Sequence, residues 1–60
     1  MNPDLQLYLS ILSNLSRARA HVLELLNANQ DRAIEDSLNL IDVAIKDLNT
    51  SKTVKDLIGR

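Results

Sequence analysis

The chain has 60 residues, 45% of them hydrophobic, with seven basic and eight acidic side chains, a net charge of −1 and no cysteine. This length allows one small domain, and the lack of cysteine excludes disulfides and cysteine-based zinc sites. The near-neutral charge gives no electrostatic footprint for DNA, no apolar run approaches the roughly 20 residues of a membrane span, and no basic segment of a signal peptide precedes the first leucines. We therefore expect a single cytoplasmic domain over residues 1–60, starting at Met1 as a complete small protein.

The composition favours an all-α fold. Twelve residues are leucine and five are alanine, which are good helix formers, whereas Phe and Trp are absent and Tyr8 is the only aromatic residue. The single proline, Pro3, and the single glycine, Gly59, lie near the termini and leave the interior uninterrupted. The expected architecture is an antiparallel helical hairpin over about 3–27 and 30–49, with a short C-terminal helical segment, that assembles into a four-helix bundle.

The first predicted helix starts at the sequence Asn2-Pro3-Asp4 and continues to about Leu26. Asn is a strong N-cap, Pro suits the first helical position, and an acidic residue in the first turn complements the helix dipole. At 100° per residue the apolar positions cover well over a third of the circumference, which is too broad for one neighbouring helix. These positions are Leu5, Leu7, Tyr8, Ile11, Leu12, Leu15, Ala18, Val22, Leu23, Leu25 and Leu26.

The second predicted helix follows a turn at Asn27-Ala28-Asn29, because Asn tolerates the left-handed conformation that ends a helix. Either Asn29 or Asp31 is expected to cap it. Its charged side chains, Asp42 among them, are expected on the outer face. Apolar residues repeat with the 4-3-4-3 spacing of a bundle seam at Ile34, Leu38, Ile41, Ile45 and Leu48. A mostly small stripe beside the seam would let a partner helix approach closely, at Ala33, Ser37, Leu40 and Ala44.

The last part of the chain leaves two alternatives. Asn49-Thr50-Ser51 interrupts the second helix, and the apolar residues that follow do not continue its seam. Residues 50–60 either fold back over the end of the bundle or form a flexible tail. In the second case an apolar patch of Val43, Val54 and Leu57 would be free to bind a partner.

A lone hairpin of this kind would leave leucines in water, which soluble monomers avoid on this scale. We therefore predict a homo-oligomer, with a dimer favoured over higher oligomers or a hetero-complex. The predicted interface residues are Leu12, Leu15, Val22, Leu26, Ile34, Leu38, Ile41 and Ile45.

Two residues of the first helix carry side chains that could take part in chemistry, His21 and Arg19. His21 is the only histidine, and without a second His or any Cys it lacks the ligands of a typical metal site, so we expect a solvated side chain and no catalytic, cofactor or metal site. Arg19 lies inside the apolar arc. Its stem is expected to pack while its head reaches an acid of the second helix or of a second protomer, with an acidic partner or a phosphate as the alternative.

The predicted function is that of a small non-enzymatic regulatory or adaptor protein that binds an unidentified protein partner. The candidate contacts are Arg17, Arg19, His21, Val43, Val54 and Leu57. The alternative is an RNA-binding dimer, since Ser10, Asn14, Arg17 and His21 form a polar, mildly basic stripe. In length and layout, though not in matching residues, the chain resembles plasmid copy-number control proteins of the Rop type, and the resemblance implies RNA binding by the first helices of a hairpin dimer.

Overall fold

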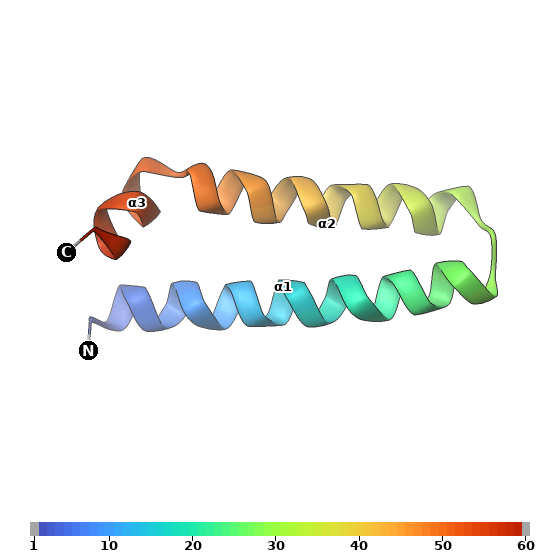
Figure 1. Ribbon diagram of the computed structural model, residues 1–60, viewed down its shortest axis with the longest axis horizontal. Helices are drawn as coiled ribbons and strands as arrows, with labels where there is room; N and C mark the ends of the chain where they lie inside the picture. The colour runs from blue at the N-terminus through green and yellow to red at the C-terminus, as the bar shows by residue number, and fades with distance from the viewer. Residues whose placement is uncertain (1, 60) are drawn as a thin grey trace.

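The structure is a computed structural model that describes residues 2–59 (Figure 1). It has three helices, α1 (Pro3–Ala28), α2 (Arg32–Thr50) and α3 (Lys52–Ile58). The described residues contain no strand, so the all-α prediction is confirmed. α1 extends one residue beyond the predicted end, and α2 begins two residues later than predicted and ends one residue later.

α1 begins at a capped turn. The Asn2 side chain accepts a hydrogen bond from the backbone N–H of Asp4 at 2.8 Å, and Pro3 occupies the first turn, where a missing N–H costs nothing. The Asp4 carboxylate lies near the positive end of the helix dipole. These local interactions start a helix of 26 residues, about 39 Å in length.

The connection between α1 and α2 has the length of the predicted turn but lies two residues later, at 29–31. Asn29 ends α1 by donating its backbone N–H to the Leu25 carbonyl at 2.9 Å and its side-chain amide to the same oxygen at 3.2 Å. Asn29 is extended, with φ of −140°, so the expected left-handed turn is wrong. Asp31 caps α2 by accepting a hydrogen bond from the Ala33 N–H at 2.7 Å. Side-chain caps on both sides make a tight connection without glycine.

Ser51 separates α2 from α3. Its backbone N–H donates to the Leu48 carbonyl at 3.3 Å where α2 ends, and its hydroxyl accepts from the Val54 N–H at 3.5 Å where α3 begins. Ser51 is extended, which redirects the chain so that α3 turns back toward the start of α1 (Figure 1). α3 ends at Gly59, whose φ of −75° is right-handed, so the glycine stops the helix without a left-handed turn.

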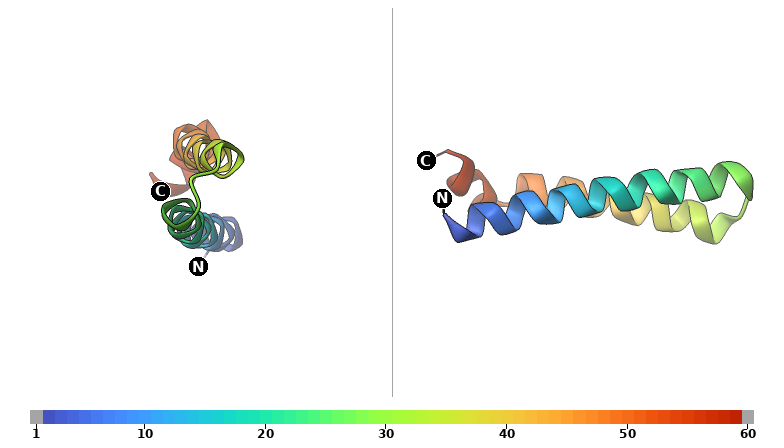
Figure 2. Two further views of the ribbon diagram at one scale, coloured as in Figure 1. Left: turned by 90° about the vertical axis from the view of Figure 1, so that its right-hand side faces the viewer. Right: turned by 90° about the horizontal axis from the view of Figure 1, so that it is seen from below.

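α1 and α2 lie side by side in opposite directions and cross at a shallow angle (Figure 2). The molecule is long and flat, measuring 43 × 18 × 11 Å. Its radius of gyration of 13.8 Å exceeds the roughly 10.4 Å expected of a compact domain of this length. Only Tyr8 and Val54 are buried among the described residues, at 7% and 6% exposure. The chain therefore encloses very little core.

Candidate interaction surface

The seam between α1 and α2 contains every residue that the sequence assigns to an oligomer interface. On α1 the seam continues the three- and four-residue spacing from Tyr8 to Leu26, and on α2 it extends from Ile34 to Leu48. All eight predicted interface residues are half-buried here, between the two helices of one chain. A seam covered by a single partner helix stays open along its edges. The contact within the chain therefore uses these residues without enclosing them.

Tyr8 and Asn49 fix the register of the helix pair at the α3 end. The Tyr8 hydroxyl donates a hydrogen bond to Asn49 Oδ1 at 2.7 Å, across 41 residues of sequence. A buried tyrosine needs a partner for its hydroxyl, and Asn49 supplies it. Asn49 was expected only in the interruption after the second helix. It directly follows the seam residue Leu48, but no local pattern marks it as the partner of Tyr8.

Arg19 and Asp42 form an ion pair in the middle of the helix pair. Arg19 Nε lies 2.6 Å from Asp42 Oδ1, and the two side chains are 44% and 46% exposed. Arg19 occupies a seam position, four residues after Leu15 and three before Val22, so its stem packs while its head reaches α2. The prediction that Asp42 lies on the outer face of the second helix is therefore wrong. Asp42 directly follows Ile41 and lies beside the seam, within reach of the long Arg19 side chain.

α1 exposes a row of large apolar side chains beside the seam. Leu7, Ile11 and Leu25 are 62%, 45% and 52% exposed, and each directly precedes a seam residue. Ala18 holds the same position before Arg19. Asn14 and His21 precede the seam residues Leu15 and Val22, and they lie between this row and the outer edge of α1. One residue back along a helix is a rotation of about 100°, so the row follows one flank of the seam over roughly 27 Å.

α2 has the corresponding row on its own flank. Leu40, at 69% exposure, directly precedes a seam residue, as do three small residues. Asp47 precedes the seam residue Leu48 and lies between this row and the outer edge of α2. In two right-handed helices that lie antiparallel, the residues preceding the seam fall on the same side of the pair. The two rows therefore share one of the two broad sides of the molecule. We call this surface the apolar face; it consists of Leu7, Ile11, Ala18, Leu25, Ala33, Ser37, Leu40 and Ala44.

The opposite broad side has a different character on α2. There the residues that directly follow the seam are Glu35, Asn39, Asp42, Lys46 and Asn49. α1 contributes Leu9 and Leu23 to this side, with exposures of 47% and 36%. Charged and amide groups thus follow every seam residue of α2 on this side, whereas on the other side Asn14, His21 and Asp47 border the apolar face.

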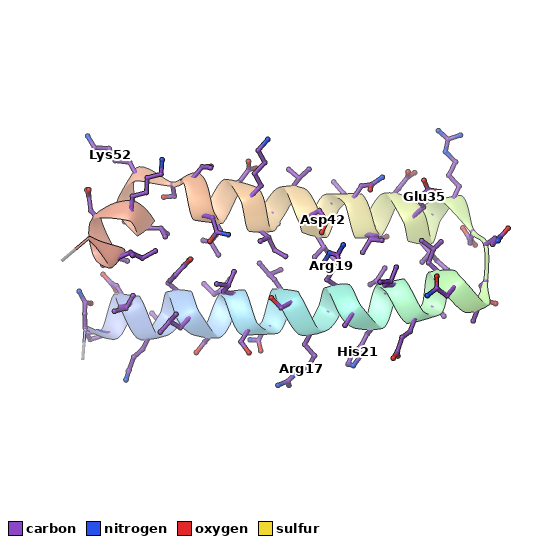
Figure 3. All side chains as sticks on the ribbon, viewed as in Figure 1. Arg17, Arg19, His21, Glu35, Asp42 and Lys52 are labelled. Carbon is purple, nitrogen blue, oxygen red and sulfur yellow. The ribbon has the colours of Figure 1, made fainter. Side chains whose placement is uncertain are left out.

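The outer edge of α1 carries the predicted polar stripe. Arg17 and His21 lie one turn apart and point away from α2 (Figure 3). Both are exposed, as are Ser10 and Asn14 on the same part of the helix. Arg19, although close in sequence, is directed toward α2 and belongs to the ion pair (Figure 3). The structure therefore separates Arg19 from the other two basic candidates.

The predicted patch of Val43, Val54 and Leu57 is not formed. Val54 is 6% exposed, so its assignment as a partner contact is wrong for this chain. Leu57 is half-buried, and Val43 is 51% exposed on α2. The reason is the break at Ser51, which redirects the chain before Val54 and removes the phase relation that a continuous helix would have with Val43.

An open hollow lies at the connection between α1 and α2. It is lined by Leu26, Asn27, Gln30, Asp31, Arg32 and Glu35. Among residues 2–59, no group of three or more His, Cys, Asp or Glu side chains is placed to hold a metal ion. Over the same residues, no helix combines the length and apolarity needed to cross a membrane.

Comparison of the chain with protein-family models, with curated protein sequences and with solved structures gives no match.

Proposed function

We propose that this chain is a small, non-enzymatic regulatory or adaptor protein of the cytoplasm. It works as a homo-oligomer of helical hairpins, a dimer forming a four-helix bundle, and acts by binding another protein. The apolar face is the surface through which the copies associate. The outer edges of the bundle remain free for the partner.

The surplus of exposed surface carries this proposal. The accessible surface is 4668 Å², whereas a compact protein of 6.7 kDa has roughly 3,900 Å². The difference, roughly 750 Å², is close to the ~800 Å² that each partner buries in a standard protein interface. Much of the apolar part of this surplus lies on the apolar face, where four large side chains are between 45% and 69% exposed.

Two charge substitutions on α2 test the proposal. Leu40→Glu places a carboxylate on the apolar face, whereas Val43→Glu places the same group three residues away, on the outer side of α2. Both positions are exposed in one copy, so neither change removes a buried contact. We expect Leu40→Glu to convert a dimer to a helical monomer and Val43→Glu to leave the dimer intact, as measured by sedimentation equilibrium and circular dichroism. Equal masses for the two variants would contradict the proposal.

The outer edges supply the candidate contacts for the protein partner. Arg17 and His21 lie on the outer edge of α1 (Figure 3). Val43, 51% exposed, lies midway between the seam residues Ile41 and Ile45, which puts it on the outer side of α2. A stoichiometric complex isolated from the native host should be weakened by Arg17→Ala or by Val43→Asp, with the mass of the dimer unchanged. A complex that survives both substitutions and is lost in Leu40→Glu would place the partner on the apolar face instead.

RNA binding is the second candidate, and the outward direction of Arg17 and His21 favours it (Figure 3). Phosphate contacts from these side chains would make binding strongly salt-dependent. The expected result is a mobility shift with structured RNA at low salt that Arg17→Ala abolishes and Arg32→Ala, on α2, retains. No shift with any structured RNA at low salt would exclude this candidate.

A further inference from the structure

We infer that two copies pack with their apolar faces together about a two-fold axis parallel to the helices, so that α1 of each copy lies over α2 of the other and both α1–α2 connections are at the same end. The inference deepens the proposed self-association and rests on it.

The sizes of the side chains on the apolar face are complementary. The row on α1 has large apolar residues at Leu7, Ile11 and Leu25 and one small residue, Ala18, with the polar residues Asn14 and His21 at the intervening seam-preceding positions. The row on α2 is the reverse, with one large apolar residue, Leu40. Its small residues are Ala33, Ser37 and Ala44, and Asp47 follows them at the end of the row. Interiors pack best where large side chains meet small ones. The two rows therefore fit one another better than either fits a copy of itself.

The levels of the residues along the molecule agree with this pairing. The hydrogen bond from Tyr8 to Asn49 and the ion pair of Arg19 with Asp42 show which positions of α1 and α2 lie abreast. By this register Ala18 is level with Leu40. A rotation about an axis parallel to the helices keeps every level, so Leu40 of one copy meets Ala18 of the second.

The same register extends the pairing to the connection end of the molecule. Leu25 of the second copy lies over the small residues Ala33 and Ser37, whereas Ile11 of the second copy is level with Asp47, beyond Ala44. Large residues thus meet small ones at the levels of Leu25 and Leu40.

A two-fold axis perpendicular to the helices gives a different interface. It places α1 on α1 and α2 on α2, so large residues such as Leu25 and Ile11 face each other and Ser37 faces small residues. The two hairpins would then lie farther apart where α1 packs on α1, because large residues meet there, than where α2 packs on α2. That arrangement would also set the two Arg17 and His21 edges next to each other, whereas the inferred one places them on opposite sides of the bundle.

The footprint of the interface is large enough for a stable dimer. The broad side of the molecule measures 43 by 18 Å, an outline of roughly 770 Å², close to the ~800 Å² per partner of a standard interface. All neighbouring helices in the inferred bundle are antiparallel, which is favourable for the helix dipoles.

A single spin label in the connection distinguishes the two arrangements. Gln30 is exposed and lies between α1 and α2, and the chain has no cysteine, so Gln30→Cys gives one labelling site per copy. Packed helix axes lie 8–10 Å apart, so the inferred dimer should give a label-to-label distance below about 30 Å in double electron–electron resonance. The perpendicular axis puts the labels at opposite ends of a molecule 43 Å in length.

The mass of the labelled protein distinguishes failure of the inferred arrangement from failure of the proposed self-association. A dimer with the short distance supports the inference, and Leu40→Glu in the same background should abolish the distance signal. A dimer with a distance of about 40 Å or more overturns the inferred arrangement and leaves the proposed self-association standing. A monomer overturns both.

Discussion

The two ends of the helix pair are built differently. At the α3 end, Tyr8 and Val54 are buried and the Tyr8 hydroxyl is hydrogen-bonded to Asn49. At the connection end, Leu26 is only half-buried and lines an open hollow whose other residues are polar. The difference is the third element, because α3 packs against both long helices at one end only. Two helices cover one side of each seam, and a third element is needed to enclose a side chain.

This contrast predicts that most of the tertiary stability of a single copy lies at the α3 end. The connection end is held by the side chains of Asn29 and Asp31, which act locally on helix termini. Substitutions at the α3 end should therefore lower the free energy of unfolding more than substitutions at the connection end.

Tyr8→Ala removes the largest buried side chain of the described chain. Truncation of a buried aromatic residue typically costs about 3–5 kcal/mol, which is comparable to the whole stability of a domain this small. We expect Tyr8→Ala to be largely unfolded by circular dichroism. Tyr8→Phe removes only the hydrogen bond to Asn49 and should cost about 1 kcal/mol in urea denaturation. Equal stability of the two variants would show that Tyr8 is not part of a packed core.

Val54→Ala should detach α3 partially from the helix pair. The substitution removes two buried methyl groups, worth about 1.5–2 kcal/mol at ~0.8 kcal/mol each. Ile58, at 59% exposure on the same helix, is the matched control, and Ile58→Ala should change stability by less than about 0.5 kcal/mol. Amide hydrogen exchange over residues 52–58 measures the effect directly. Equal exchange rates in the two variants would remove the distinction between a docked and a frayed α3.

Asp31→Ala tests the connection end. The Asp31 side chain caps α2 through the Ala33 N–H, and loss of such a cap costs about 1 kcal/mol. Asp36→Ala, within α2, removes the same charge without a cap and should not lower the denaturation midpoint. A larger loss for Asp31→Ala than for Tyr8→Ala would reverse the proposed order of the two ends.

The ion pair of Arg19 with Asp42 should contribute less to stability than Tyr8, Val54 or the Asp31 cap. Both side chains are more than 40% exposed, and ion pairs in this setting contribute about 0.2–1 kcal/mol. A double-mutant cycle with Arg19→Ala and Asp42→Ala measures the coupling free energy, which should shrink as salt is added. A coupling well above 1 kcal/mol that persists in high salt would show that the pair is shielded from solvent, as it would be beneath another protein.

The local elements of this fold are predictable from the sequence because their causes are local. Asn2 and Pro3 predict the start of α1, and the spacing from Ile34 to Leu48 identifies the seam of α2. The broad apolar arc of α1 and the mostly small stripe of α2 were also apparent as patterns. What the patterns could not tell was that both rows fall on the same side of one molecule, since this depends on the antiparallel arrangement.

The long-range contacts were missed for a related reason. Which residues lie abreast depends on the connection, and the sequence placed its turn at 27–29, whereas α1 continues through Ala28 and Asp31 caps α2. The pairing of Tyr8 with Asn49 follows from that register and not from any local signal. Likewise, the burial of Val54 depends on a change of direction at Ser51, which periodicity alone cannot describe.

The mass of the unaltered chain in solution tests the central claim most directly. Sedimentation equilibrium at micromolar concentration should give twice the chain mass of 6.7 kDa, about 13.4 kDa. A mass of 6.7 kDa over the same concentration range would contradict self-association through the apolar face.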